Sequence, residues 1–128
     1  MKNKKFNNTV LVYNSTATKV DKVWLCYGQK EYKKFSEARY KSFTETIEKG
    51  GVATLWDRHN GSYEVCIGMK KIPDTLQLKG LIVHELSHAM DYIMRENGLT
   101  DTEYRAYTMQ SMYQIAMEAI DNILKEKG

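Results

Sequence analysis

Two histidines and a glutamate near the middle of the chain have the residue types and the spacing that metal chemistry requires. They occur in the sequence HELSH at positions 84–88, which has the pattern HExxH. In an α-helix, residues four apart lie about 40° apart around the axis and about 6 Å apart along it, so His84 and His88 can face one metal ion. Glu85 lies about 100° around from His84, where its carboxylate can reach a metal-bound water without binding the metal. The pattern therefore predicts a zinc ion held by the two histidines.

A purely structural role for the two histidines is the alternative. HExxH is expected by chance roughly once in two hundred chains of this length and composition. Apolar residues surround most of the helix predicted around the motif, which indicates a largely buried helix. Buried imidazoles without hydrogen-bond partners would be costly, whereas a zinc ion would use their lone pairs. Metal binding is therefore favoured over a structural role.

A catalytic zinc needs a third protein ligand and one position for water. Four side chains are candidates for this ligand: Glu103, Asp91, Asp101 and His59. Asp91 lies one turn beyond His88, where its short side chain is better suited to accept a hydrogen bond from an imidazole N–H. Glu103 opens the next helix after a turn at Gly98, and it reaches the metal if the two helices cross closely. Capping of its own helix, in a capping box with Thr100, is the alternative role for Glu103.

The elements that must position these residues follow from the hydrophobic periodicity of the chain. β-branched and aromatic residues predict strands at Phe6–Tyr13 and Lys22–Tyr27, and helical spacing predicts a helix at Lys30–Lys49 that Gly50-Gly51 ends. Asn60-Gly61 between two runs of strand-forming residues predicts a hairpin of Val52–Asp57 and Ser62–Met69.

Two long helices are predicted in the C-terminal half. The first carries the HExxH motif, with Asp74 as its N-cap and Gly98 at its end. The second begins near Thr100–Thr102 and runs toward Glu126. The order of elements predicts an α+β fold with a small, mostly antiparallel sheet.

Composition limits the class of protein. The chain has 128 residues, of which 42% are apolar and 27% charged, values typical of a single soluble globular domain over residues 1–128. The longest apolar run, Val23–Tyr27, is far too short to cross a membrane. Cys26 and Cys66 have neither CxxC spacing nor a disulfide-rich context, so we expect free thiols that bind no metal, in a cytoplasmic protein.

Charge is distributed unevenly along the chain. Residues 1–49 carry 11 Lys and Arg against 5 Asp and Glu, whereas residues 50–128 carry 8 against 11. A basic half can bind nucleic acid or another acidic partner, but no arginine cluster or recognised binding motif accompanies these lysines. A solvated surface is the favoured interpretation, and nucleic-acid binding is the alternative.

The sequence HELSHAMDY at 84–92, followed by EYRAY at 103–107, resembles the zincin metallopeptidases of the gluzincin type. It is most similar to the very small members found in bacteriophage genomes, and the resemblance covers roughly residues 52–114. The resemblance implies a minimal zincin-like domain with His84, His88 and Glu103 as zinc ligands, Glu85 as catalytic base, and a peptide or protein as substrate. Zinc would acidify its bound water and polarise the scissile carbonyl, and Glu85 would accept the proton.

The remaining parts of such a site have several candidates. Tyr104, Tyr107 or His59 could stabilise the oxyanion, although core packing explains Tyr107 equally well. In zincins an edge strand beside the metal-binding helix holds the extended peptide, and here Ser62–Met69 is the expected equivalent. Two aromatic residues could form pocket walls or simply pack within the hairpin: Trp56 and Tyr63.

Three functions are therefore consistent with the sequence. The first is an active zinc metallopeptidase in the cytoplasm of a bacterial host. The second is a zincin-fold protein that binds a partner without catalysis and keeps zinc for stability. The third is a nucleic-acid-associated protein that uses its basic first half. Loss of activity with retained zinc in Glu85→Gln would separate the first from the second.

Overall fold

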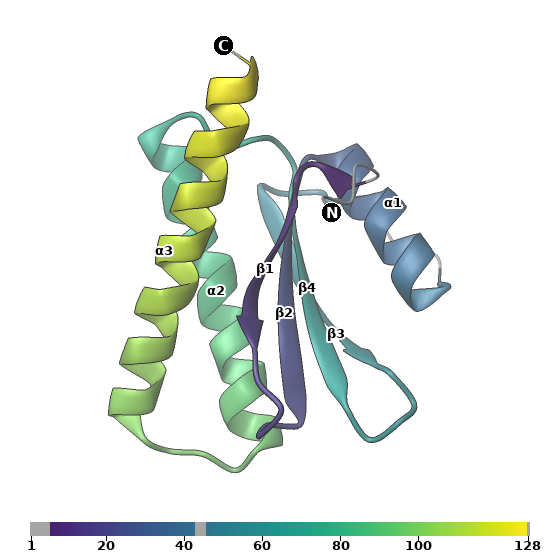
Figure 1. Cartoon of the computed structure of the whole chain (residues 1–128), viewed down its shortest axis with the longest axis vertical. Helices are drawn as coiled ribbons and strands as arrows, with labels where there is room; N and C mark the ends of the chain where they lie inside the picture. The colour runs from purple at the N-terminus through teal and green to yellow at the C-terminus, as the bar shows by residue number, and fades with distance from the viewer. Residues whose placement is uncertain (1–5, 43–45, 128) are drawn as a thin grey trace.

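The structure, a computed structural model, describes residues 6–42 and 46–127. Its elements are β1 (Thr9–Asn14), β2 (Val20–Tyr27), α1 (Gln29–Tyr40), β3 (Gly51–Asp57), β4 (Tyr63–Met69), α2 (Leu76–Glu96) and α3 (Thr102–Lys127). They form three layers, in which α1 covers one face of the sheet and α2 and α3 lie side by side on the other (Figure 1). No helix among the described residues is long and apolar enough to cross a membrane.

The sheet has the strand order β1-β2-β4-β3. β1 pairs with β2 and β3 pairs with β4 in antiparallel hairpins, and β2 pairs with β4 in parallel. The parallel pair requires a crossover connection, and α1 lies within it. The predicted α+β class and the mostly antiparallel sheet are confirmed.

One sheet prediction is wrong. Ser62–Met69 was expected to be an edge strand, but β4 is an inner strand because it pairs with β3 on one side and with β2 on the other. A hairpin signal identifies two paired strands without indicating which of them meets the rest of the sheet. The edge strand on this side of the sheet is β3.

Alternation along β2 separates two cores. Val23, Leu25 and Tyr27 belong to the larger aliphatic core beneath α2 and α3, where the Tyr27 hydroxyl donates a 2.9 Å hydrogen bond to the Ala116 carbonyl. Cys26 and its neighbours on the opposite face belong to a smaller, aromatic core beneath α1. Side chains of successive strand residues point to opposite faces, so a single strand supplies both cores.

Helix α1 is shorter than predicted. It ends at Tyr40, where Lys41 adopts a left-handed conformation with φ of 55° and donates its N–H to the Glu37 carbonyl. Gly50 and Gly51 therefore do not end this helix. A Cβ atom on Gly50 would collide with Leu81 of α2, so the glycine pair allows the start of β3 to approach α2 closely.

The ends of the two long helices also differ from expectation. Thr75, not Asp74, is the N-cap of α2, because its hydroxyl accepts a 3.1 Å hydrogen bond from the Leu78 N–H. After α2, Gly98 has φ of 63°, which a glycine adopts without strain at a helix end. The chain then returns as α3 (Figure 1).

Candidate metal centre

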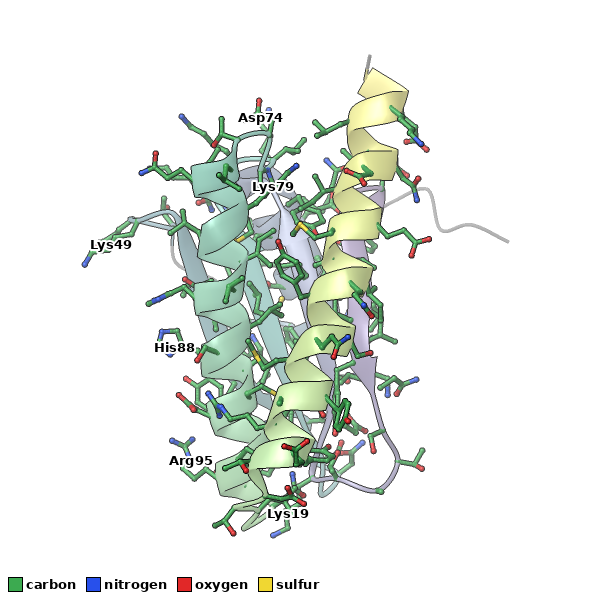
Figure 2. All side chains as sticks on the ribbon, turned by 90° about the vertical axis from the view of Figure 1, so that its left-hand side faces the viewer. Lys19, Lys49, Asp74, Lys79, His88 and Arg95 are labelled. Atoms are coloured by element: carbon green, nitrogen blue, oxygen red, sulfur yellow. The ribbon has the colours of Figure 1, made fainter. Side chains whose placement is uncertain are left out.

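Helix α2 presents the two histidines of the motif to solvent. Ile82, Leu86 and Met90 are fully buried against the sheet, whereas His84 and His88 are exposed. The expectation of a helix buried on nearly all sides is therefore wrong, because its apolar residues form one wide face against the core. Figure 2 shows His88 projecting from α2 on the side away from α3.

The geometry of the two imidazoles fits a shared metal ion. The Nε2 atoms of His84 and His88 are 3.2 Å apart, and the ring planes are inclined at 85°. Zinc–nitrogen bonds of about 2.0–2.1 Å in a tetrahedral site place two nitrogen ligands about 3.3 Å apart. The two histidines thus have the separation that chelation requires, without a change of side-chain conformation. In the metal-free protein one imidazole can donate a hydrogen bond to the other.

Glu85 lies beside the histidines but inside the fold. Its side chain is 5% exposed. A Cβ atom on Gly51 would lie 3.0 Å from Cγ and 3.2 Å from Oε2 of Glu85, so the carboxylate lies against the first residue of β3. Burial raises the pKa of Glu85 above its ordinary value, and the positive charges of protonated His84 and His88 oppose this rise. Gly51 is a contributor to the site that the sequence motif did not identify.

The structure does not bring Glu103 to the two histidines. No group of three or more His, Cys, Asp or Glu side chains that could hold a metal occurs within residues 6–42 and 46–127. Arg105 of α3 donates a hydrogen bond to Ser87 of α2, so its side of α3 faces α2. Glu103 lies two residues earlier, about 200° around the axis of α3, and therefore on the other side of this helix. Glu103 is exposed, and its role as third ligand stays a prediction that this arrangement does not favour.

The backbone of Glu103 has a clear structural partner. Oδ1 of Asp101 accepts hydrogen bonds of 2.9 Å from the Glu103 N–H and 3.2 Å from the Tyr104 N–H. Asp101 therefore caps α3, and the capping box expected from Thr100 is wrong because the helix begins one residue later than that pattern needs.

Asp91 pairs with an arginine. Its Oδ1 lies 3.0 Å from Nη1 of Arg105, whose Nη2 lies 3.2 Å from the Ser87 hydroxyl. Both contacts join α3 to the flank of α2 opposite Glu85. Asp91 thus forms an interhelical ion pair in this structure, and its role as acceptor for an imidazole N–H stays a prediction.

The three candidates for oxyanion stabilisation occupy separate places. The Tyr104 hydroxyl lies 2.8 Å from the Tyr13 hydroxyl of β1. Tyr107 is 69% exposed on α3. His59, which was also a candidate for the third metal ligand, lies in the turn between β3 and β4. Its Nδ1 is 3.7 Å from Oδ2 of Asp57. None of these contacts involves the histidines of the motif, so the choice among the three stays open.

The strand next to the motif has an open edge. At one end of the β3–β4 hairpin, the Lys70 N–H donates to the Gly50 carbonyl at 2.9 Å. At the other end, the Arg58 N–H donates to the Ser62 carbonyl at 3.1 Å. Because such bonds alternate in an antiparallel pair, the even-numbered residues of β3 bond to β4 and the odd-numbered ones direct their backbone groups outward. The outward groups begin at Gly51, beside Glu85.

The expected pocket walls are divided between the two faces of the sheet. Trp56 stacks on Tyr40, with ring centroids 4.7 Å apart, in the aromatic core beneath α1. It therefore lies on the face opposite the HExxH motif. Tyr63 packs against the aliphatic core on the α2 face. Cys26 and Cys66 are free and fully buried beneath α1, so they do not lie with the histidines.

Comparison of the chain with protein-family models, curated proteins and solved structures found no significant match.

Proposed function

We propose that this chain is a zinc-dependent peptide hydrolase in which His84 and His88 are two of the zinc ligands and Glu85 is the general base. The 3.2 Å separation of the two imidazole nitrogens carries the proposal, together with the buried carboxylate one residue along the same helix. The free cysteines are consistent with a cytoplasmic location, which we propose for the protein.

The reaction assigned to the site is hydrolysis of an amide bond. A bound zinc ion would supply Lewis acidity to a substrate carbonyl and acidity to a water molecule. Glu85 accepts a proton from the attacking water and returns it to the leaving amine. The raised pKa of Glu85, which its burial causes, makes the carboxylate a stronger base than an exposed glutamate.

The substrate in this proposal is an extended peptide that pairs with the open edge of β3. Gly51, Ala53 and Leu55 direct their backbone groups toward this edge, as the alternation of the hairpin bonds requires. An added strand would form main-chain hydrogen bonds there. Because Gly51 touches Glu85, that strand would pass close to the proposed base.

Glu85→Gln tests the catalytic part of the proposal. Glutamine keeps the size of the side chain but cannot accept the proton, so hydrolysis of fluorescein-labelled casein in zinc-containing buffer should fall by about 10²–10⁴-fold. Zinc content should not change. Glu118→Gln, at an exposed position of α3, is the matched control and should retain full activity. Wild-type rates in Glu85→Gln would contradict the proposal, and zinc binding without hydrolysis by the wild type would favour a non-catalytic binding protein.

Ala53→Pro tests the role of the strand edge. Proline removes an N–H that points to the open edge, while the ladder between β3 and β4 keeps its hydrogen bonds. Casein hydrolysis should fall by about tenfold or more, at nearly unchanged zinc content, because one main-chain hydrogen bond to the peptide is lost. Thr54→Pro instead removes a ladder bond and should destabilise the fold. Full activity in a folded Ala53→Pro protein would exclude this edge as the peptide site.

A further inference from the structure

A cavity lies on the opposite face of the sheet from the histidine pair, between the sheet and α1. Its volume is about 600 Å³, within the range of sites that hold small molecules. The residues that give it its chemical character are Phe6, Thr9, Trp24, Phe35, Arg39 and Arg58. They come from β1, β2, α1 and the segments that precede β1 and follow β3, so the cavity is a product of the fold and not of one local motif.

Aromatic rings form one part of the cavity wall. The ring centroids of Trp24 and Phe35 are 5.0 Å apart, and those of Phe6 and Phe35 are 5.3 Å apart in an edge-to-face arrangement. The guanidinium carbon of Arg39 lies 4.9 Å from the Trp24 ring centroid. Such a wall favours a flat, unsaturated ligand, because aromatic rings pack in stacked or edge-to-face geometry.

Guanidinium groups form another part of the wall. Arg39 donates to both carboxylate oxygens of Glu64, at 2.6 and 2.7 Å. Nε of Arg58 lies 3.9 Å from the same carboxylate. The Glu64 side chain is buried, and its carboxylate also accepts hydrogen bonds from Trp24 Nε1 at 3.0 Å and from the Tyr40 hydroxyl at 3.1 Å.

The charges of this cluster do not balance. Within this cluster one carboxylate, that of Glu64, faces the two guanidinium groups of Arg39 and Arg58, whereas the Glu31 carboxylate accepts a hydrogen bond from the Thr9 hydroxyl at another part of the wall. Arg58 is the less strongly paired of the two with Glu64, because its ion pair is long. Its Nη1 donates to the Arg39 carbonyl at 2.8 Å, and its guanidinium carbon lies 5.5 Å from the Tyr40 ring centroid. Arginine binds planar anionic groups through its remaining N–H donors.

We propose that this cavity binds a small planar aromatic molecule that carries one anionic group. The ring packs against Phe35 and Trp24, and the anion pairs with the guanidinium of Arg58. The inference does not depend on the proposed hydrolase activity, since the cavity and the HExxH motif lie on different faces of the sheet.

Binding of 8-anilinonaphthalene-1-sulfonate to the full chain tests this inference. This aromatic sulfonate should bind with a stoichiometry of one, whereas its uncharged analogue N-phenyl-1-naphthylamine should bind about tenfold more weakly, because it lacks the anion. Titration followed by dye fluorescence and by calorimetry gives both affinities. Equal affinity for the two dyes would overturn the proposal.

Two variants locate the binding. Arg58→Gln should weaken sulfonate binding by about tenfold and leave binding of the neutral dye unchanged. Ala38→Phe, which places a ring at the cavity wall, should weaken binding of both dyes. Arg95→Gln, at an exposed site on α2, is the control and should alter neither affinity. Unfolding curves of each variant separate loss of binding from loss of fold, and an unaltered sulfonate affinity in folded Arg58→Gln or Ala38→Phe would overturn the proposal.

Discussion

Glu64 and Glu85 are both buried, at 3% and 5% exposure, on opposite faces of the sheet, and their surroundings differ in kind. Glu64 accepts hydrogen bonds from a guanidinium, an indole and a phenol, and pairing with Arg39 holds its pKa below the ordinary value in spite of burial. Burial raises the pKa of Glu85, which has an aliphatic core beneath it and two exposed histidines beside it. A fully paired carboxylate is typical of a structural role, and a desolvated one beside two histidines is typical of a reactive site.

The largest expected effect comes from unpairing Glu64. Arg39→Ala leaves a buried carboxylate without its bidentate partner, so the free energy of unfolding should fall by about 3 kcal/mol in urea denaturation. The double variant Arg39→Ala with Glu64→Gln should recover part of this loss, because the uncompensated charge is gone. Arg95→Ala, whose side chain is 63% exposed and pairs with Glu96, should change stability by less than about 0.5 kcal/mol. Similar values for Arg39→Ala and Arg95→Ala would contradict the claim that Arg39 stabilises the buried carboxylate of Glu64.

A smaller effect, of opposite sign, is expected for Glu85. In the metal-free protein, Glu85→Gln should raise the free energy of unfolding at neutral pH by about 1 kcal/mol, because the desolvated charge is removed. The raised pKa also determines how the free energy of unfolding changes with pH. The raised pKa makes the wild type lose stability as pH rises from 4.5 through the pKa of the folded state, and the variant should lack this loss.

The pH dependence of Glu64 has the reverse direction and is the internal control. Its lowered pKa means that its contribution to stability is present above pH 4.5 and is lost as pH falls through the pKa of the folded state. Glu64→Gln should therefore remove part of the acid sensitivity, whereas Glu85→Gln should not. Urea denaturation at closely spaced pH values from about pH 3 to about pH 8 measures both slopes.

The histidine pair was predictable because its geometry is local. His84 and His88 are placed by the repeat of one helix, so the sequence alone predicts that their imidazoles meet. The position of Glu103 depends on how α3 packs against α2, and Arg105 occupies that contact. Helical periodicity identifies α3 and its apolar side, which packs on the core, but it does not fix the register in which α3 packs along α2.

The remaining differences also arise from tertiary contacts. The sequence predicted that Gly50 and Gly51 end a helix. In the structure their lack of side chains instead allows β3 to pack closely against α2. The Arg39–Glu64 pair joins α1 to β4, over a separation of 25 residues in the sequence. The sequence feature that could have indicated this pair is the single charged residue within the otherwise apolar strand Tyr63–Met69. A charge in such a strand predicts a buried partner without identifying it.

Zinc stoichiometry of the purified protein tests the central claim most directly. After equilibration with zinc and removal of the excess, elemental analysis should find about one zinc per chain in the wild type and almost none in His88→Ala. His59→Ala removes the third histidine of the chain, at an exposed position with its ring beside Asp57, and should keep the full amount. Glu103→Gln, measured in parallel, tests the predicted third ligand: a reduced zinc content would assign that role to Glu103, and the full amount would assign it to another group. Equal zinc in the wild type and in His88→Ala would contradict a metal centre at the two histidines.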